Sequence, residues 1–167
     1  LYGTFSKTGI TNLNPLARKL VTPESGDSYY AWDTSATTSL SNTFRGASSL
    51  TDISGISNWN IQPQSLSETF SGTGITSVAA LRDWDVSSLT SINSMLENTS
   101  NLTSLSGLEN WGDKLGNLRT ASRTFANSGV EDATNLNSWV LPSFATYGKD
   151  RTFDNTPAAA NGLLPSW

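Results

Sequence analysis

The sequence contains no cysteine and no histidine, and only 14% of its 167 residues are charged. Without these two residue types, a Ser-His-Asp triad, a Cys-His pair and a zinc site of thiolate or imidazole ligands cannot form. The net charge is −4 and the only adjacent basic pair is Arg18-Lys19, which argues against nucleic-acid binding. No run of 18 or more apolar residues is present, so we expect no insertion of this chain into a membrane.

The acidic residues offer two pairs for chemistry, Asp83 with Asp85 and Glu131 with Asp132. A glycosidase uses two carboxylates, and Ca²⁺ prefers carboxylate and carbonyl oxygens. However, Asn58 stands in the repeat position of Asp83, and the acids do not recur at one repeat phase. We therefore interpret the acids as residues that cap turns, and we expect no enzyme activity, no catalytic residue, no metal and no cofactor.

The tryptophans are the most regular feature of the chain, because all six lie 25 to 28 residues apart, at Trp32, Trp59, Trp84, Trp111, Trp139 and Trp167. A second column keeps step with them: Phe5, Phe44, Phe70, Leu96, Phe125 and Phe153. Apolar residues also recur at every third position into the Trp, as in Leu50, Ile53, Ile56 and Trp59. Two bulky columns at a fixed phase indicate a structural unit that stacks on its own copies. The Trp column is expected to be buried between them.

This spacing favours a leucine-rich-repeat-like fold, in which each unit gives one short strand and one return segment. The prediction is an α/β repeat solenoid: a right-handed coil with short parallel strands and short helical return segments, in about six coils of 25–28 residues. Apolar residues at Leu89, Ile92 and Leu96 predict one such helical return. The strands are expected near residues 50–54, 75–79, 102–106 and 130–134, and the whole chain, 1–167, is expected to form one domain.

Residues 14–30 interrupt the first coil with about a dozen extra residues. Asn14-Pro15 is typical of an N-cap followed by proline at the first helical position, which predicts a short helix over 16–20 that stops before Pro23. Tyr29 and Tyr30 follow a polar loop. The insertion is either a cap over the end of the core or a loop that carries function, and the cap is favoured because terminal repeats are commonly atypical.

Several motifs resemble those of the BspA-like leucine-rich-repeat surface proteins of bacteria. They are Asn58-Trp59-Asn60, the segment 83–89 with sequence DWDVSSL, and Leu102-Thr103-Ser104-Leu105. The resemblance covers about residues 31–139 and implies a secreted or cell-surface protein with an adhesive role. A hydroxyl-rich, cysteine-free composition is typical of such exported proteins. Because the chain begins and ends inside repeats, we expect a fragment of a longer surface protein whose anchor lies elsewhere.

The expected function is that of a monomeric adhesin module at the bacterial cell surface. Its partner would be a host glycoprotein, mucin, extracellular matrix or a glycan, bound through an extended polar repeat face. The alternative is a structural spacer or stalk that presents other domains of a wall-anchored protein. The residues expected to contact a ligand are Tyr29, Tyr30, Thr51, Asp52, Thr76, Ser77, Thr103, Ser104, Glu131 and Asp132.

Overall fold

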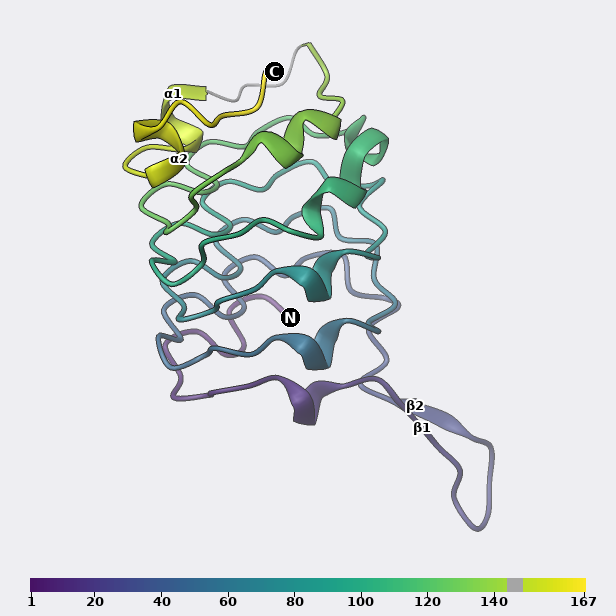
Figure 1. Ribbon diagram of the computed structural model, residues 1–167. Helices are drawn as coiled ribbons and strands as arrows, with labels where there is room; N and C mark the ends of the chain where they lie inside the picture. The colour runs from purple at the N-terminus through teal and green to yellow at the C-terminus, as the bar shows by residue number, and fades with distance from the viewer. Residues whose placement is uncertain (144–148) are drawn as a thin grey trace.

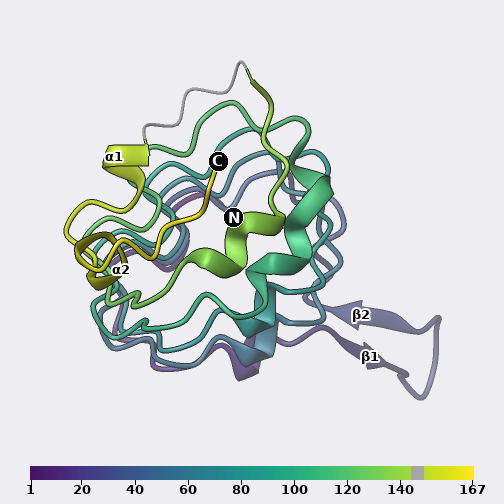
Figure 2. The same ribbon diagram turned by 45° about the horizontal axis from the view of Figure 1, so that its top comes forward.

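The computed structural model describes residues 1–143 and 149–167, and most of this chain consists of turns and irregular segments (Figure 1). Stretches that end in successive tryptophans lie above one another, and we call each such stretch a layer (Figures 1 and 2). The regular elements are short: η1 (Asn14–Leu16), β1 (Lys19–Val21), β2 (Tyr29–Ala31), η2 (Ser54–Ile56), η3 (Ala79–Leu81), η4 (Leu108–Leu115), η5 (Thr134–Ser138), α1 (Lys149–Thr152) and α2 (Pro157–Ala160).

The prediction of a leucine-rich-repeat-like solenoid with parallel strands is wrong. Within the described chain, the only paired strands are β1 and β2, which are antiparallel, and parallel pairing is limited to isolated bridges. Where strands were expected near 50–54 and 75–79, the chain bends into 3-10 turns that begin at Ser54 and Ala79. The cause lies in Asp52 and Ser77, whose side-chain oxygens accept the backbone N–H two residues later. Such local bonds compete with an extended strand.

The predicted helical return segments are also wrong, because the chain from Leu89 passes through an isolated bridge at Ser91 into turns over residues 93–98. The backbone N–H groups of Ile92, Ser94 and Leu96 donate across to carbonyl groups of the next layer, at 3.1, 2.9 and 2.8 Å. An α-helix would need those donors for its own carbonyl groups. Ser94 also has a φ of 52°, and Arg123, in the next layer, has a φ of 57°. A left-handed residue inside each of these segments excludes a continuous right-handed helix.

The expected burial of the tryptophan column is confirmed, since Trp59, Trp84, Trp111 and Trp139 expose only 4, 1, 0 and 3% of their surface. The rings of Trp59 and Trp84 stack with centroids 6.4 Å apart, and those of Trp111 and Trp139 at 6.0 Å. Trp32, in the first layer, differs by remaining 39% exposed.

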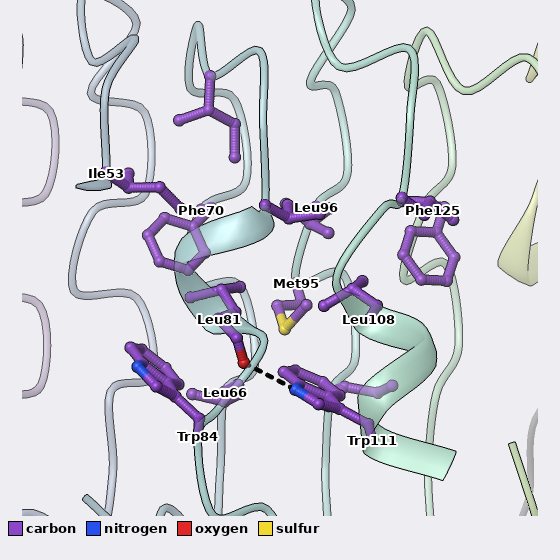
Figure 3. Close-up of a cluster of buried hydrophobic side chains, with 14 of the residues drawn as sticks. Ile53, Leu66, Phe70, Leu81, Trp84, Met95, Leu96, Leu108, Trp111 and Phe125 are labelled. Carbon is purple, nitrogen blue, oxygen red and sulfur yellow. Dashed lines mark hydrogen bonds between the residues drawn. The ribbon is translucent and has the colours of Figure 1, made fainter. Parts of the chain in front are cut away.

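Each buried indole also finds a hydrogen-bond acceptor in the preceding layer. Trp84 Nε1–H donates to the carbonyl oxygen of Ile56 at 3.2 Å, and Trp111 Nε1–H to that of Leu81 at 2.9 Å (Figure 3). A buried indole N–H requires such a partner, because leaving it unpaired would cost the desolvation energy of the group. The same bond therefore recurs from layer to layer and fixes how far one layer sits from the next.

Serine hydroxyls add a polar seam between the layers. Ser41 and Ser65 share a hydrogen bond of 2.8 Å, Ser67 and Ser91 share one of 2.7 Å, and Thr120 donates to Ser91 at 3.0 Å. These groups are partly buried, so pairing them with one another replaces the water they lose. The abundance of serine and threonine in the sequence thus has a structural use at this seam.

Strands β1 and β2 form a hairpin that extends away from the layers (Figures 1 and 2). The expected helix over residues 16–20 is wrong, because η1 ends at Leu16 and Ala17 already has an extended backbone, with ψ of 136°. The residue that precedes η1 is Leu13 rather than the expected Asn14. Most residues from 19 to 30 are exposed, so this segment contributes little to the core.

Candidate binding surface

The predicted polar face lies just before the 3-10 turns of successive layers. Apart from the two tyrosines, its predicted residues are Thr51, Asp52, Thr76, Ser77, Thr103, Ser104, Glu131 and Asp132. All eight are exposed except Asp52, which is half-buried. The structure brings several of them together: Ser104 and Asp132 form a parallel bridge, and the backbone N–H of Glu131 donates to the carbonyl oxygen of Thr103 at 3.0 Å.

Most of the predicted side chains on this face already serve the fold. Asp52 Oδ1 accepts the N–H of Ser54 at 2.8 Å, and Asp132 Oδ1 accepts the N–H of Thr134 at 2.8 Å and its hydroxyl at 2.6 Å. These hydrogen bonds hold the pKa of both carboxyl groups below the ordinary Asp value. The interpretation of Asp132 as a turn-capping residue is therefore confirmed.

Two open hollows lie on this face, each between adjacent layers. The first has a volume of about 430 Å³ and a lining of small hydroxyl and methyl groups; the second has about 410 Å³ and is more polar. The first hollow is lined by Thr51, Asp52, Ile53, Ser54, Ser57, Thr76, Ser77, Ala79 and Ala80. The second is lined by Ser104, Leu105, Ser106, Glu109, Asp132, Thr134 and Asn135. The predicted residues Thr103 and Glu131 line neither hollow.

The sequence carries no signal for Glu109, which lines the second hollow, because its position is not acidic in the other layers. Burial raises its pKa, but hydrogen bonds from its own and the Gly107 backbone N–H and from Asn135, together with Arg82, outweigh this effect and lower it. Its carboxylate lies 3.9 Å from the Arg82 guanidinium. The described residues contain no group of three His, Cys, Asp or Glu side chains suited to a metal ion.

The hairpin supplies the other two predicted residues, and it exposes them. Tyr29 and Tyr30 are 57% and 42% exposed, in contrast to the tryptophans of the core. Tyr30 lies opposite Leu20 in the hairpin register, and Tyr29 lies opposite Val21. Because successive residues of a strand point to opposite faces, the two tyrosines occupy different sides of the hairpin.

Arg18, at the base of the hairpin, is a further residue that the sequence analysis did not select. Its guanidinium carbon lies 3.5 Å from the centre of the Tyr30 ring. Asn58 holds the Arg18 backbone with two hydrogen bonds, one to its N–H at 3.2 Å and one from Asn58 Nδ2 to its carbonyl oxygen at 2.8 Å. Ser57, which precedes Asn58 in the chain, lines the first hollow.

Comparison with known proteins assigns the chain to a family. The family described as "Mycoplasma protein of unknown function, DUF285" matches residues 16–139. This span includes the hairpin and the four layers that end at Trp59, Trp84, Trp111 and Trp139. The chain belongs to the DUF285 family. No curated protein and no solved structure matches the chain. None of the helices in the described part of the chain has the length and apolar character needed to cross a membrane.

Proposed function

We propose that this DUF285 chain is a binding module of a bacterial cell-surface protein, and that it adheres to a host or cell-surface glycoprotein or glycan. The observation that carries the proposal is the contrast between the buried tryptophans and the exposed hairpin. Leu20, Tyr29 and Tyr30 are 58, 57 and 42% exposed on an element that projects from the layers.

Exposed tyrosines on a projecting element suit recognition. A tyrosine ring offers a large apolar face with a polar end and has few rotatable bonds to immobilise, so it loses little entropy on binding. Tyrosines are accordingly frequent anchors of protein interfaces. The first hollow adds the hydroxyl groups of Thr51, Ser54 and Thr76, which can exchange hydrogen bonds with a hydroxylated ligand such as a sugar.

The spacer hypothesis remains the second candidate, and the indole hydrogen bonds favour it. The bonds from Trp84 to Ile56 and from Trp111 to Leu81 link each layer rigidly to the one before, which is the property that a stalk requires. In that function the hairpin would contact nothing outside the chain, so the unaltered chain would bind no glycoprotein.

A double variant, Tyr29→Ser with Tyr30→Ser, tests the proposal. Binding to immobilised mucin and extracellular-matrix glycoproteins is measured beside the melting temperature, with Tyr2→Ser as a control at a 72% exposed tyrosine outside the hairpin. We expect the double variant to lose binding at an unchanged melting temperature and the control to keep it. Retained binding per folded molecule in the double variant would rule out recognition by the hairpin tyrosines, and no binding by the unaltered chain would favour the spacer.

A further inference from the structure

We propose that Arg18 gives this module a preference for anionic glycans, by binding a carboxylate or a sulfate ester on a sugar; this inference rests on the adhesive function proposed above. The ligand chemistry is that of a planar or tetrahedral oxyanion attached to a sugar ring. The site consists of the Arg18 guanidinium, the Tyr30 ring and the exposed Leu20 side chain.

The guanidinium is held in place before any ligand arrives. Its carbon lies 3.5 Å from the Tyr30 ring centre, so the ring supports one face of the planar group. The backbone of Arg18 is fixed on both sides by Asn58, at 3.2 and 2.8 Å. A charged side chain that is already ordered loses less entropy on binding, which favours recognition.

Arg18 also lacks a carboxylate partner among the described residues. Arg45, Arg82 and Arg123 each form an ion pair with an acidic side chain, whereas Arg18 forms none with the described side chains, those of residues 1–143 and 151–167. Its Nε is buried and has no hydrogen-bond partner there.

Asp33 is the acidic group that Arg18 influences. Its carboxylate, however, accepts the backbone N–H of Ser35 at 3.0 Å. Hydrogen bonds from Ser35 are the main reason that the pKa of Asp33 is lowered, with Arg18 contributing less. The positive charge of Arg18 is therefore not neutralised by a contact within the described fold.

These properties fit an oxyanion better than a neutral group. The two terminal nitrogens of a guanidinium present parallel N–H donors that match the oxygens of a carboxylate or sulfate group. Leu20 lies opposite Tyr30 in the register and so on the same side of the hairpin, where it can cover the apolar face of a sugar ring. Lysine at this position would keep the charge but lose both the planar fork and the stacking on Tyr30.

A glycan array with matched sets tests the inference. Each set carries one core glycan in three forms: neutral, capped with sialic acid, and sulfated. The chain is compared with Arg18→Gln, Arg18→Lys and, as a control for net charge, Arg82→Gln at a side chain that is 48% exposed. We expect the unaltered chain to prefer one or both anionic forms. Arg18→Gln and Arg18→Lys should weaken that binding about tenfold or more, the size expected for charge-assisted hydrogen bonds, while Arg82→Gln should not.

The outcomes of this experiment distinguish a carboxylate ligand from a sulfate ester. They also distinguish the preference for anionic glycans from the adhesive function. Preference for the sialylated form alone assigns a carboxylate, and preference for the sulfated form alone assigns a sulfate ester; either result supports the inference. Equal binding to neutral and anionic forms, or full binding by Arg18→Gln, overturns it and leaves the adhesive function standing. Absence of binding to every glycan and glycoprotein overturns both. Unchanged melting temperatures are expected for the Arg18 variants, since the Asn58 bonds use only backbone atoms of Arg18.

Discussion

Removal of Trp84 is the sharpest test of how the layers hold together. Its ring is only 1% exposed, and it stacks on Trp59 with centroids 6.4 Å apart and an interplanar angle of 5°. The indole N–H donates to the Ile56 carbonyl oxygen of the preceding layer at 3.2 Å. Trp84→Ala therefore removes a ring contact and an interlayer hydrogen bond together.

Loss of the buried ring accounts for most of the expected decrease in the unfolding free energy. A buried tryptophan removes about 150–250 Å² from water, and its truncation to alanine costs roughly 3–5 kcal/mol of unfolding free energy. The hydrogen bond adds only about 0.5–1.5 kcal/mol to the folded state. Its loss also leaves no orphaned acceptor, because the Ile56 carbonyl oxygen accepts the Trp59 backbone N–H at 3.2 Å as well. Trp84→Phe, which keeps an aromatic ring but no donor, should cost roughly 1–3 kcal/mol.

Guanidinium chloride denaturation, followed by the fluorescence of the remaining tryptophans, measures these losses. Thr76→Ala on the exposed face is the control and should change the unfolding free energy by less than about 0.5 kcal/mol. Equal shifts of the midpoint for Trp84→Ala and Thr76→Ala would refute the assignment of the two faces. A loss in Trp84→Phe as large as that in Trp84→Ala would refute the claim that ring burial is the larger contribution.

Two further predictions concern the close packing around Gly55 and the dependence of stability on pH. Gly55→Ala should lower the unfolding free energy by roughly 1–3 kcal/mol or more, because its Cβ would clash with the Leu13 carbonyl oxygen. Gly116→Ala, with no atom within 4 Å of its Cβ, should leave the unfolding free energy unchanged, and equal losses in the two variants would contradict the close packing at Gly55. Hydrogen bonds from the residue two positions later lower the pKa of Asp85 and Asp132 from the ordinary 3.8. A lowered pKa in the folded state gives stability that is present above the unfolded value and lost as pH falls through the folded one, so the urea midpoint should be constant from about pH 5.5 to 7 and fall below about pH 4. A midpoint that is unchanged at pH 2.5 would show that these bonds do not stabilise the fold.

The burial of the tryptophans could be predicted because it depends on a pattern that any stacked arrangement must satisfy. An apolar residue three positions before each Trp places both side chains on the inner surface of the layer. Trp84 and Trp111 follow this rule, and both are buried. The periodicity established which residues face inward, but it did not establish the backbone conformation that puts them there.

The strands and helices could not be predicted because single hydrogen bonds decide them. A polar residue such as Ser77 suits an exposed strand face, yet its hydroxyl accepts the N–H of Ala79 and starts a 3-10 turn. Likewise the apolar spacing of Leu89, Ile92 and Leu96 suits a helix, but the N–H of Ile92 and that of Leu96 bond to the next layer. A bond between residues 28 apart leaves no signal in a local window.

The candidate site, too, could be predicted only in part from the sequence. The exposure of Tyr29 and Tyr30 agrees with their selection as candidate contacts, whereas the predicted polar face proves to be occupied in part by its own turns. Strands of three residues are too short for alternation to reveal the hairpin. The stacking of Arg18 on Tyr30 joins positions 12 residues apart across that hairpin, so only the folded register brings it to notice.

Hydroxyl-radical footprinting of the chain bound to a mucin glycopeptide shows whether the hairpin tyrosines contact the ligand. Tyr2, Tyr29 and Tyr30 are exposed and should react readily in the free chain, and the buried Trp84 should not. We expect the ligand to protect Tyr29, Tyr30 or both, while Tyr2 reacts as before. Unchanged oxidation of both hairpin tyrosines in the presence of a saturating ligand would contradict it.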